Sequence, residues 1–289
     1  MAHLKLRRAE NISGDIFVDN TCIDCDTCRW MSPKIFHRNG AKSAVYYQPT
    51  NQIERLEAMQ ALLSCPTNSI GTVETPKDIK KVQETLPILV TDNVYHCGYH
   101  SEKSFGAASY FILRPEGNIL VDSPQFSAPL VKRLEAMGGI KYMYLTHKDD
   151  AADHQKFREH FSCDRMLHVD DISPDTKNIE IKLTGTDPIS LTPDLLIIPV
   201  TGHTKGHTVL LYQKFLFTGD HLAWSSHLNQ LYAFRRHCWY SWSEQIISMG
   251  KLISYNFEWV LPGHGHRYHT DKKTMQQELK KCIVWMEKY

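Results

Sequence analysis

The stretch Thr21-Cys22-Ile23-Asp24-Cys25-Asp26-Thr27-Cys28, joined much later by Cys65-Pro66, decides the fold of the first part of this chain. Three cysteines with two residues between neighbours can bind three corners of a cubane iron–sulfur cluster, and one remote cysteine supplies the fourth thiolate. Because all four are present, the pattern favours [4Fe–4S] over [3Fe–4S]. The predicted cluster ligands are Cys22, Cys25, Cys28 and Cys65.

The residues after this loop favour one cluster over two. In two-cluster ferredoxins a further cysteine follows three residues later, before a proline, and serves the other cluster; here Ser32-Pro33 stands there. A four-cysteine zinc site is the alternative, but zinc sites usually pair cysteines two and two. Residues 19–28 and 65–70 resemble the small single-cluster ferredoxins of bacteria. The resemblance covers about the first 75 residues and implies a ferredoxin-like module.

Composition describes an ordinary globular protein. The chain has 289 residues, enough for two domains, and a net charge of +1, which gives no sign of a nucleic-acid or membrane-surface partner. No apolar run approaches the roughly 20 residues that span a bilayer, and residues 1–10 lack the apolar segment of a secretory signal. The four remaining cysteines are scattered, as expected for free thiols in a reducing compartment. We therefore expect a cytoplasmic protein.

Apolar patterns predict an α+β chain with a ferredoxin-like domain at 1–78 and a second domain at 79–289. In the first we expect a strand at 15–18 and a helix at 51–63, with Ile53, Leu56 and Leu63 on one face. The second opens with a hairpin and continues with alternating strands and helices, a pattern typical of sheets covered by helices. The predicted strands are 110–114, 118–122, 142–146, 195–200, 209–212, 215–218 and 259–261, and the predicted helices follow Ser127, include Phe157 and Phe161, and span 241–253 and 272–288.

Three motifs in the second domain each follow an apolar run: GHTKGH at 202–207, FTGD at 217–220 and PGHG at 262–265. We expect His203, Asp220 and His264 to lie on loops at one sheet edge, where two imidazoles and a carboxylate suit zinc, iron or manganese. Together the motifs resemble the metallo-β-lactamase superfamily, which includes hydroxyacylglutathione hydrolases and persulfide dioxygenases. The resemblance covers about 86–289 and implies an αββα sandwich. It also implies that His203 binds a first metal, Asp220 bridges two metals and His264 binds the second.

The fourth motif of that superfamily, T-H-x-H-x-D-H, is altered here to Thr-His-Lys-Asp-Asp-Ala-Ala-Asp-His at 146–154. Aligned on His147, the first histidine is kept and Asp149 replaces the second. Aligned on Asp153 and His154, the second-site pair is kept instead. A two-residue insertion would let His147, Asp153 and His154 all point inward. These registers stay open, and with them whether one, two or no ions bind.

The leading hypothesis is a redox metalloenzyme, because a pure hydrolase has no need of an electron carrier. The cluster would exchange electrons with a non-haem iron site at His147, His203 and Asp220, supported by His264, His154 and Asp153. The first alternative is a zinc- or iron-dependent hydrolase of thioesters or esters, with a structural or sensing cluster. The second is a non-catalytic redox sensor with a degenerate site. Asp149 and Asp153 are the candidate catalytic carboxylates, and the expected partners are a small-molecule substrate and a redox partner protein.

His207 and the segment 96–100 contain further histidines outside the predicted ligand set. His207, at the end of GHTKGH, is expected to support the metal ligands rather than bind metal itself. The segment His96-Cys97-Gly98-Tyr99-His100 precedes the first hairpin of the second domain. It could line the rim of an active site, but we favour a surface loop.

Overall fold

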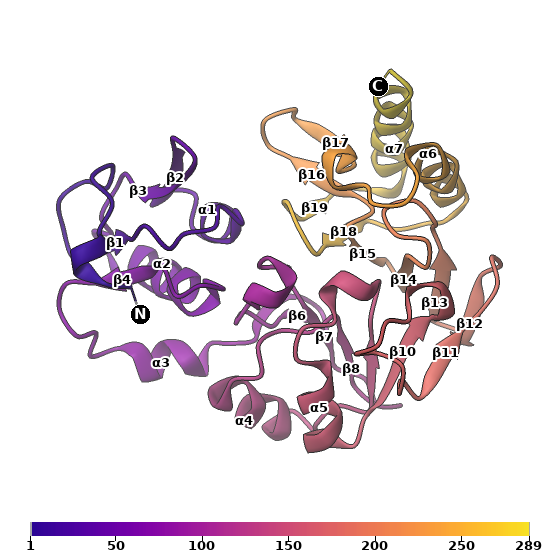
Figure 1. Ribbon diagram of the computed structural model, residues 1–289, viewed down its shortest axis with the longest axis horizontal. Helices are drawn as coiled ribbons and strands as arrows, with labels where there is room; N and C mark the ends of the chain where they lie inside the picture. Colours follow the sequence, from indigo (N-terminus) through magenta and orange to yellow (C-terminus); the bar gives the residue numbers. More distant parts are fainter. Residues whose placement is uncertain (1, 289) are drawn as a thin grey trace. The chain divides into compact units, whose positions relative to one another are not determined.

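The computed structural model describes residues 2–288, which form two compact units (Figure 1). Unit 1 comprises the chain up to Lys141 together with Ala152–Cys163; unit 2 comprises Tyr142–Ala151 and the chain from Asp164 on. The predicted domain boundary at residue 78 does not coincide with this division, because the chain from 79 to 141 packs with the cysteine-bearing residues of unit 1. The boundary itself stays a prediction.

The cysteine-bearing part of unit 1 is built from short strands and one long helix. The long helix, α2, begins after Asn51, whose side-chain oxygen accepts the Glu54 N–H at 3.0 Å and so caps the helix. The predicted strand at 15–18 and helix at 51–63 are thus confirmed to within one residue. The elements are η1 (Leu4–Leu6), β1 (Ile16–Val18) paired with β4 (Ile70–Thr72), α1 (Thr27–Met31), the hairpin of β2 (Phe36–Asn39) and β3 (Lys42–Val45), and α2 (Gln52–Ser64).

The predicted apolar face of α2 is wrong at one position. Ile53 is 72% exposed, whereas Ala58, Met59 and Leu62 pack into the core with β1 and β2. The cause is Glu54, which is buried because its carboxylate accepts the Thr50 N–H at 2.8 Å and pairs with Lys34. That contact fixes the rotation of the first helical turn and points Ile53 outward.

The remainder of unit 1 is an antiparallel run of strands with helices before and after it. The predicted hairpin is confirmed: Tyr110 pairs with Val121 and Ile112 with Ile119. Every residue of these two strands is buried. The elements are α3 (Ile79–Glu84), β5 (Ile88–Thr91), β6 (Val94–His96), η2 (Glu102–Ser104), β7 (Tyr110–Ile112), β8 (Ile119–Val121), α4 (Ala128–Ala136) and α5 (His154–Phe161).

The prediction of a surface loop at 96–100 is wrong. All five residues are buried, with His96 at 0% and His100 at 1% exposure. The segment continues β6 into the interior, where the Cys97 N–H donates to the Ser109 carbonyl at 3.0 Å. Such a loop can be buried because its polar groups find partners inside the protein.

Unit 2 contains a parallel group of strands and a six-stranded sheet. In the parallel group β10 pairs with both β9 and β11, and the six-stranded sheet has the order β12-β13-β14-β15-β18-β19. The predicted strands of this unit are all present. The strands are β9 (Tyr142–Tyr144), β10 (Asp164–His168), β11 (Ile181–Leu183), β12 (Ile189–Thr192), β13 (Leu195–Pro199), β14 (Thr208–Tyr212), β15 (Phe215–Gly219), β16 (Ala223–Ser225), β17 (Gln230–Tyr232), β18 (Trp259–Pro262) and β19 (Tyr268–His269).

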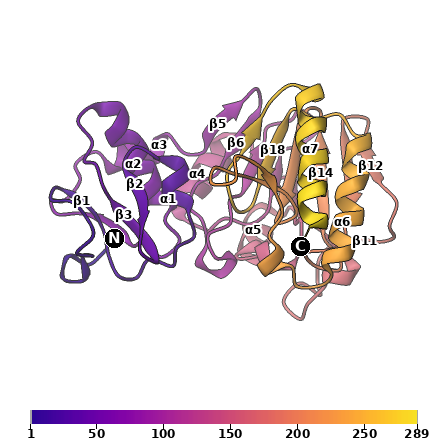
Figure 2. The same cartoon turned by 90° about the horizontal axis from the view of Figure 1, so that it is seen from above.

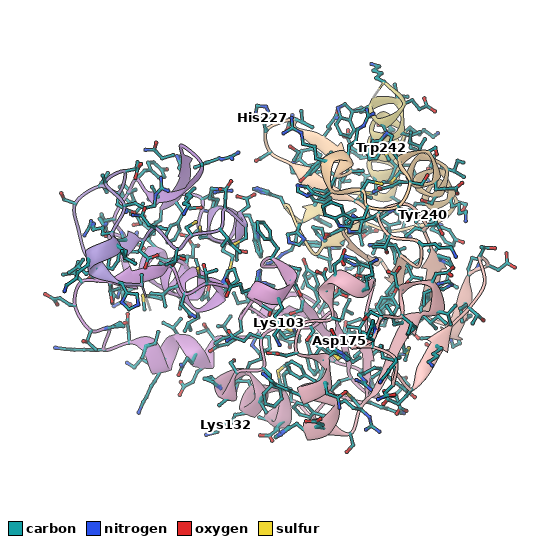
Figure 3. All side chains as sticks on the ribbon, in the orientation of Figure 1. Lys103, Lys132, Asp175, His227, Tyr240 and Trp242 are labelled. Atoms are coloured by element: carbon teal, nitrogen blue, oxygen red, sulfur yellow. The ribbon has the colours of Figure 1, made fainter. Side chains whose placement is uncertain are left out.

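Two helices, α6 (Trp242–Lys251) and α7 (Lys272–Glu287), lie side by side against the six-stranded sheet (Figure 2). Met249 of α6 and Leu279 of α7 pack with Leu216 of β15 in one core. Trp242, labelled in Figure 3 at the start of α6, donates its indole N–H to the Met286 carbonyl at 3.2 Å and so ties the two helices together. The loops with the histidine and aspartate motifs follow the ends of β13, β15 and β18 in this sheet.

None of the helices between residues 2 and 288 has the length and apolar character needed to cross a membrane.

Candidate metal centres

The four predicted cluster cysteines lie within the first part of unit 1. Cys22 and Cys25 belong to the loop that leads into α1, Cys28 lies in the first turn of α1, and Cys65 caps the C-terminal end of α2. All four are free of disulfides. Chiefly through burial, and with repulsion from Cys65 and Cys22 adding to the shift, the pKa of Cys25 rises to about 11. Burial likewise raises the pKa of Cys28 well above its ordinary value.

Buried, crowded thiols with raised pKa values become thiolates only when a cation replaces their protons. The irons of a cubane cluster supply that charge, so these residues fit the group. The Ser69 N–H also donates to Cys65 Sγ at 3.2 Å, a contact that a bound thiolate would strengthen. Arg29, which sequence reasoning missed, holds the loop closed through Asp24 at 2.6 Å and Asp26 at 2.5 Å.

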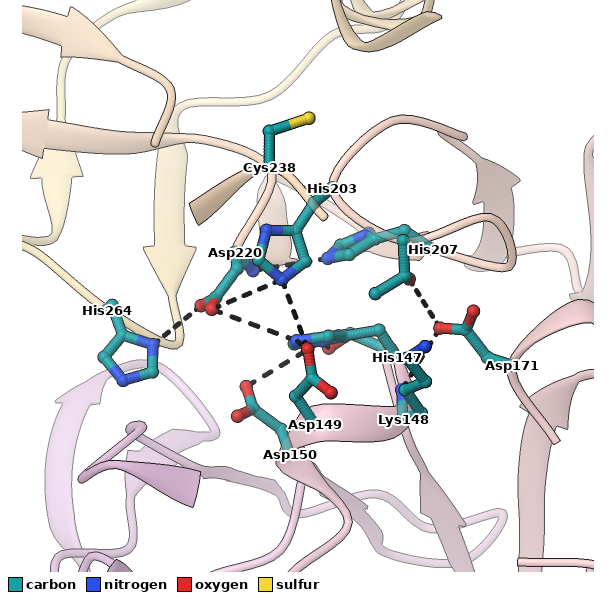
Figure 4. Close-up of polar contacts among 12 residues, drawn as sticks. His147, Lys148, Asp149, Asp150, Asp171, His203, His207, Asp220, Cys238 and His264 are labelled. Atoms are coloured by element: carbon teal, nitrogen blue, oxygen red, sulfur yellow. Dashed lines mark hydrogen bonds and ion pairs between the residues drawn. The ribbon is translucent and has the colours of Figure 1, made fainter. Parts of the chain in front are cut away.

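The second site lies wholly in unit 2, on loops that follow four strands (Figure 4). His147 follows β9, His203 follows β13, Asp220 follows β15 and His264 follows β18. One atom each from His147, His203 and Asp220 lie within 4.8 Å of one another. Asp220 Oδ2 is 3.9 Å from His147 Nε2 and 3.7 Å from His203 Nε2, and all three side chains are buried.

A second carboxylate faces the same two imidazoles. Asp149 Oδ2 lies 3.8 Å from His147 Nε2 and 3.6 Å from His203 Nε2. The 3-10 turn η3 (Lys148–Asp150) directly after His147 brings it there. The Asp149 side chain is 41% exposed, so Asp149 lies between the two imidazoles and solvent. In this register Asp149 stands where the superfamily motif has its second histidine.

The two imidazoles present nitrogens that have no partner of their own. Among the described residues, Nε2 of His147 and Nε2 of His203 are buried and make no hydrogen bond. His147 Nδ1 is 2.9 Å from Thr146 Oγ1, which fixes the ring so that Nε2 faces the carboxylates. Buried polar atoms are rarely left unsatisfied, and convergent imidazole and carboxylate groups are what zinc or iron binds. The residues present therefore fit a metal ion.

The charge states of these groups suit a cation. Burial lowers the pKa of His147 to about 4. Burial opposes the ionisation of Asp220 and Asp149, but the nearby histidines outweigh it. His264 holds the pKa of Asp220 well below its usual range, and the His203 imidazole 3.6 Å away lowers the pKa of Asp149. At neutral pH His147 is therefore neutral and both carboxylates are ionised, which is the state that metal ligands require.

Asp220 contacts more than the two imidazoles. Its other oxygen, Oδ1, is 2.8 Å from His264 Nδ1, so one carboxylate links His264 to the set around His147 and His203. His207 supports Asp220 from behind, because its Nε2 accepts the Asp220 N–H at 3.3 Å. This is the supporting role expected for His207.

The other half of the altered motif has different neighbours. Asp153 and His154 belong to unit 1, at the start of α5. The Asp153 carboxylate accepts from Lys103 Nζ at 2.8 Å and from the Phe126 N–H at 3.0 Å; Lys103, on η2, is labelled in Figure 3. These charge and backbone partners give Asp153 a structural use, and the metal-binding roles of Asp153 and His154 stay predictions.

One carboxylate that the sequence did not single out organises the site. Asp171 ends η4 (Val169–Asp171) and is 1% exposed. Its Oδ2 accepts from Thr204 Oγ1 at 2.5 Å and from the Lys148 N–H at 3.1 Å, and its Oδ1 accepts from the Gly206 N–H at 2.8 Å. The residue therefore holds the loop of His203 against the loop of His147. The only sequence signal is an acidic pair at the end of an apolar run.

Each of three site residues is preceded by a glycine that another part of the site crowds. A Cβ at Gly219, before Asp220, would lie 2.4 Å from Thr146 Oγ1. A Cβ at Gly263, before His264, would lie 2.8 Å from Asp150 Oδ2. At Gly202, before His203, it would meet the Gln245 backbone at 2.4 Å. The crowding atoms are backbone at Gly202 and side chains of the site at Gly219 and Gly263, so a Cβ at any of the three positions would force its neighbour to shift.

Comparison with known proteins supports a cluster-binding domain in the first part of the chain. Residues 18–72 match the family described as "4Fe-4S single cluster domain of Ferredoxin I", and the match includes all four cysteines. This part of the chain is a single-cluster ferredoxin domain. The ferredoxin domain supports a [4Fe–4S] cluster as cofactor, as predicted. A search of curated protein sequences gave no match.

Solved structures show the fold of the rest. The DIM-1 metallo-β-lactamase exposed to ceftazidime aligns with a TM-score of 0.55 and 18% identity, over 68% of this chain and 95% of its own. A metallo-β-lactamase from Pontibacter korlensis aligns at 0.52 and 15%, over 70% and 98%. The mono-zinc form of FIM-1 from Pseudomonas aeruginosa aligns at 0.51 and 16%, over 68% and 93%. The predicted combination of a ferredoxin module and a metallo-β-lactamase fold is confirmed.

Proposed function

We propose that this protein is a redox metalloenzyme in which the ferredoxin domain exchanges single electrons with an iron ion held by His147, His203 and Asp220. The observation that supports the proposal is the convergence of two imidazoles and one carboxylate in a chain that also carries four cluster cysteines. When bound by such a set, a non-haem iron supplies open coordination positions for oxygen or redox chemistry.

The protein side chains have distinct tasks in this proposal. His147 and His203 present neutral nitrogens, and Asp220 and Asp149 supply negative charge that stabilises the cation. Asp149 is the member nearest solvent, so it is the carboxylate best placed to meet a small-molecule substrate or carry its proton. Trp239, 62% exposed with its ring 6.3 Å from that of His203, offers an apolar surface beside the site. A separate redox protein would supply or accept the electrons.

A zinc-dependent hydrolase of esters or thioesters is the second candidate. The observation in its favour is the fold, since FIM-1 of the same fold is described in a mono-zinc form. Histidines with a carboxylate and one open position are the usual catalytic zinc set. The hydrolase proposal predicts turnover without any electron donor, whereas the redox proposal predicts no turnover under that condition.

Metal analysis of protein purified without oxygen separates the two. We expect about four irons with sulfide per chain from the cluster, plus a further iron that survives in the double variant Cys25→Ala/Cys28→Ala and disappears in His147→Ala. If the further metal is zinc and not iron, the hydrolase becomes the favoured proposal. If no metal beyond the cluster is found, both enzyme proposals are contradicted, and the non-catalytic redox sensor becomes the favoured one.

The electron route has its own test. Cys65→Ser should abolish turnover while unit 2 stays folded and keeps its metal, because electron supply then fails without damage to the second site. Circular dichroism and metal content of the variant are the controls. Full turnover in Cys65→Ser would contradict the redox proposal.

A further inference from the structure

The buried segment between β6 and β7 approaches a cluster ligand with bare backbone. Gly106 adopts φ +86°, and a Cβ there would lie 2.8 Å from Cys25 Cβ and 3.1 Å from Cys25 Sγ. Gly106 lies outside the residues that match the ferredoxin family, 18–72. Residues added to the ferredoxin domain within unit 1 therefore shape the surroundings of one cluster thiolate.

A chain of hydrogen-bonding groups leads from this segment to Cys25. Thr27 Oγ1 is 3.4 Å from Cys25 Sγ and 3.1 Å from His100 Nδ1. His100 Nε2 is in turn 2.8 Å from His96 Nε2. Both imidazoles are buried, and the Trp30 ring packs 5.1 Å from that of His96 and 6.0 Å from that of His100.

The chemistry of the groups fixes the direction of the chain. A metal-bound Cys25 is a thiolate and can only accept, and a carbonyl such as that of Gly106 can only accept. The Thr27 hydroxyl lies 3.4 Å from both acceptors, so its hydrogen could go to either. His100 Nδ1 is closer to the Gly106 carbonyl, at 2.7 Å, and must donate to it. The Gly106 carbonyl thus already accepts one hydrogen bond, and the Cys25 thiolate is the charged and stronger acceptor, so we expect Thr27 to donate to Cys25.

His96 completes the arrangement by fixing the tautomer of His100. Because Nδ1 of a neutral His100 holds its hydrogen, Nε2 is an acceptor, and the hydrogen between the two rings belongs to His96 Nε2. Every donor then points toward the cluster: His96 to His100, His100 to Gly106 and Thr27, and Thr27 to Cys25.

We propose that His96 and His100 are positioning residues that direct the Thr27 hydroxyl hydrogen onto Cys25 and thereby raise the reduction potential of the cluster. Hydrogen bonds to cluster sulfurs are one of the factors that set this potential. A donor stabilises the reduced state more than the oxidised one, because reduction adds a negative charge to the thiolate environment. The proposal concerns only the cluster of the ferredoxin domain, so it stands or falls independently of the metal in unit 2.

The test is a potentiometric titration of the full chain, purified without oxygen and followed by the electron paramagnetic resonance signal of the reduced cluster. Thr27→Val keeps the shape and removes the hydroxyl; it should lower the equilibrium constant for reduction by about tenfold, which is about 59 mV for one electron. Thr27→Ser should keep the wild-type potential. Thr67→Val is a matched control, since Thr67 Oγ1 is 3.9 Å from Cys65 Sγ and bonds to Ser69 Oγ at 2.6 Å; its shift in potential should be smaller.

A pair of variants at His100 tests the positioning role. His100→Asn keeps a donor near the place of Nδ1 and should retain the potential. His100→Leu removes the donor that competes with Thr27 for the Gly106 carbonyl, so the Thr27 hydrogen turns toward that carbonyl and the potential should fall as in Thr27→Val. Wild-type potential in Thr27→Val or His100→Leu, with iron and sulfide content unchanged, would overturn the proposal. If Thr27→Val does not assemble its cluster, the His100 pair decides.

Discussion

Asp171 both binds Gly206 and fills the space where a side chain of residue 206 would stand. Its Oδ1 accepts the Gly206 N–H at 2.8 Å, and a Cβ at Gly206 would lie 2.7 Å from Asp171 N and 2.9 Å from its Cβ. The same carboxylate accepts from Lys148 and Thr204. Two loops that carry metal-site histidines are therefore held by one residue that touches neither imidazole.

Asp171→Asn should weaken metal binding without removing a ligand. The amide turns one acceptor into a donor that faces a backbone N–H, so at least one of the three bonds is lost. Loss of an outer partner of this kind typically reduces metal affinity about 10- to 100-fold. Competition with a chelator measures the change. Asp170→Asn is the control, because Asp170 pairs with Lys205 at 2.8 Å and lies 3.8 Å from His168 Nδ1, neither of which belongs to the metal site. This variant should leave the affinity unaltered, and equal affinity in both variants would contradict the role given to Asp171.

Two aspartates of the altered motif should respond differently to the same change. Asp149→Asn removes a charge 3.6 Å from His203 Nε2 and should lower the metal content of unit 2. Asp153→Asn loses its ion pair with Lys103 and should lower stability while metal content stays near wild type. Metal analysis and thermal unfolding of the two variants measure both effects. The reverse pattern would show that the motif binds metal through Asp153.

Gly219→Ala should damage the site through sterics alone. Gly219 has φ +48°, and its new Cβ would lie 2.4 Å from Thr146 Oγ1 and 3.0 Å from His207 Nε2. We expect a loss of about 2 kcal/mol or more in the free energy of unfolding, as for other strained and overpacked positions, together with loss of metal. Gly185→Ala is the matched control: its φ is +87° but nothing lies within 4 Å. It should lose only about 1 kcal/mol from backbone strain, as judged by urea unfolding.

Buried histidines should make the metal-free protein less stable in acid. Burial lowers the pKa of His147 to about 4 and that of His221 to about 3, whereas an unfolded histidine titrates near 6.5. Below about pH 6.5 the unfolded chain binds protons that the folded chain does not, so the free energy of unfolding falls as pH decreases, by up to about 1.4 kcal/mol per pH unit for each histidine. Urea midpoints measured between about pH 7.5 and about pH 5 should decrease. His221→Leu should flatten that slope; an unchanged slope would rule out His221 as a cause.

The sequence predicted those features that single motifs determine. Four cysteines specify the cluster loop, and glycine–histidine or glycine–aspartate pairs after apolar runs place His203, Asp220 and His264 at strand ends. The register of residues 146–154 could not be predicted, because alanines at 151 and 152 remove the charged anchors of the superfamily pattern. The η3 turn settles where Asp149 points, and such a turn leaves no periodic signal.

Contacts between segments far apart in sequence were equally hidden. Asp171 accepts hydrogen bonds from Lys148 and Gly206, which lie 23 and 35 residues away in the sequence. No local sequence pattern predicts such a partner. His96 and His100 resemble surface polar residues until their partners are known. Tertiary packing decides both cases, because buried polar groups become recognisable only together with the groups that satisfy them.

The crowded glycines before His203, Asp220 and His264 have a consequence for protein engineering and for evolution. A mutational library that varies one loop alone will be dominated by collisions with the others, since Gly219 faces Thr146 and Gly263 faces Asp150. New chemistry at this centre should therefore arise through substitutions of residues on its solvent side, such as Asp149 and Trp239. The three glycines before His203, Asp220 and His264 therefore limit which new activities can be selected at this site.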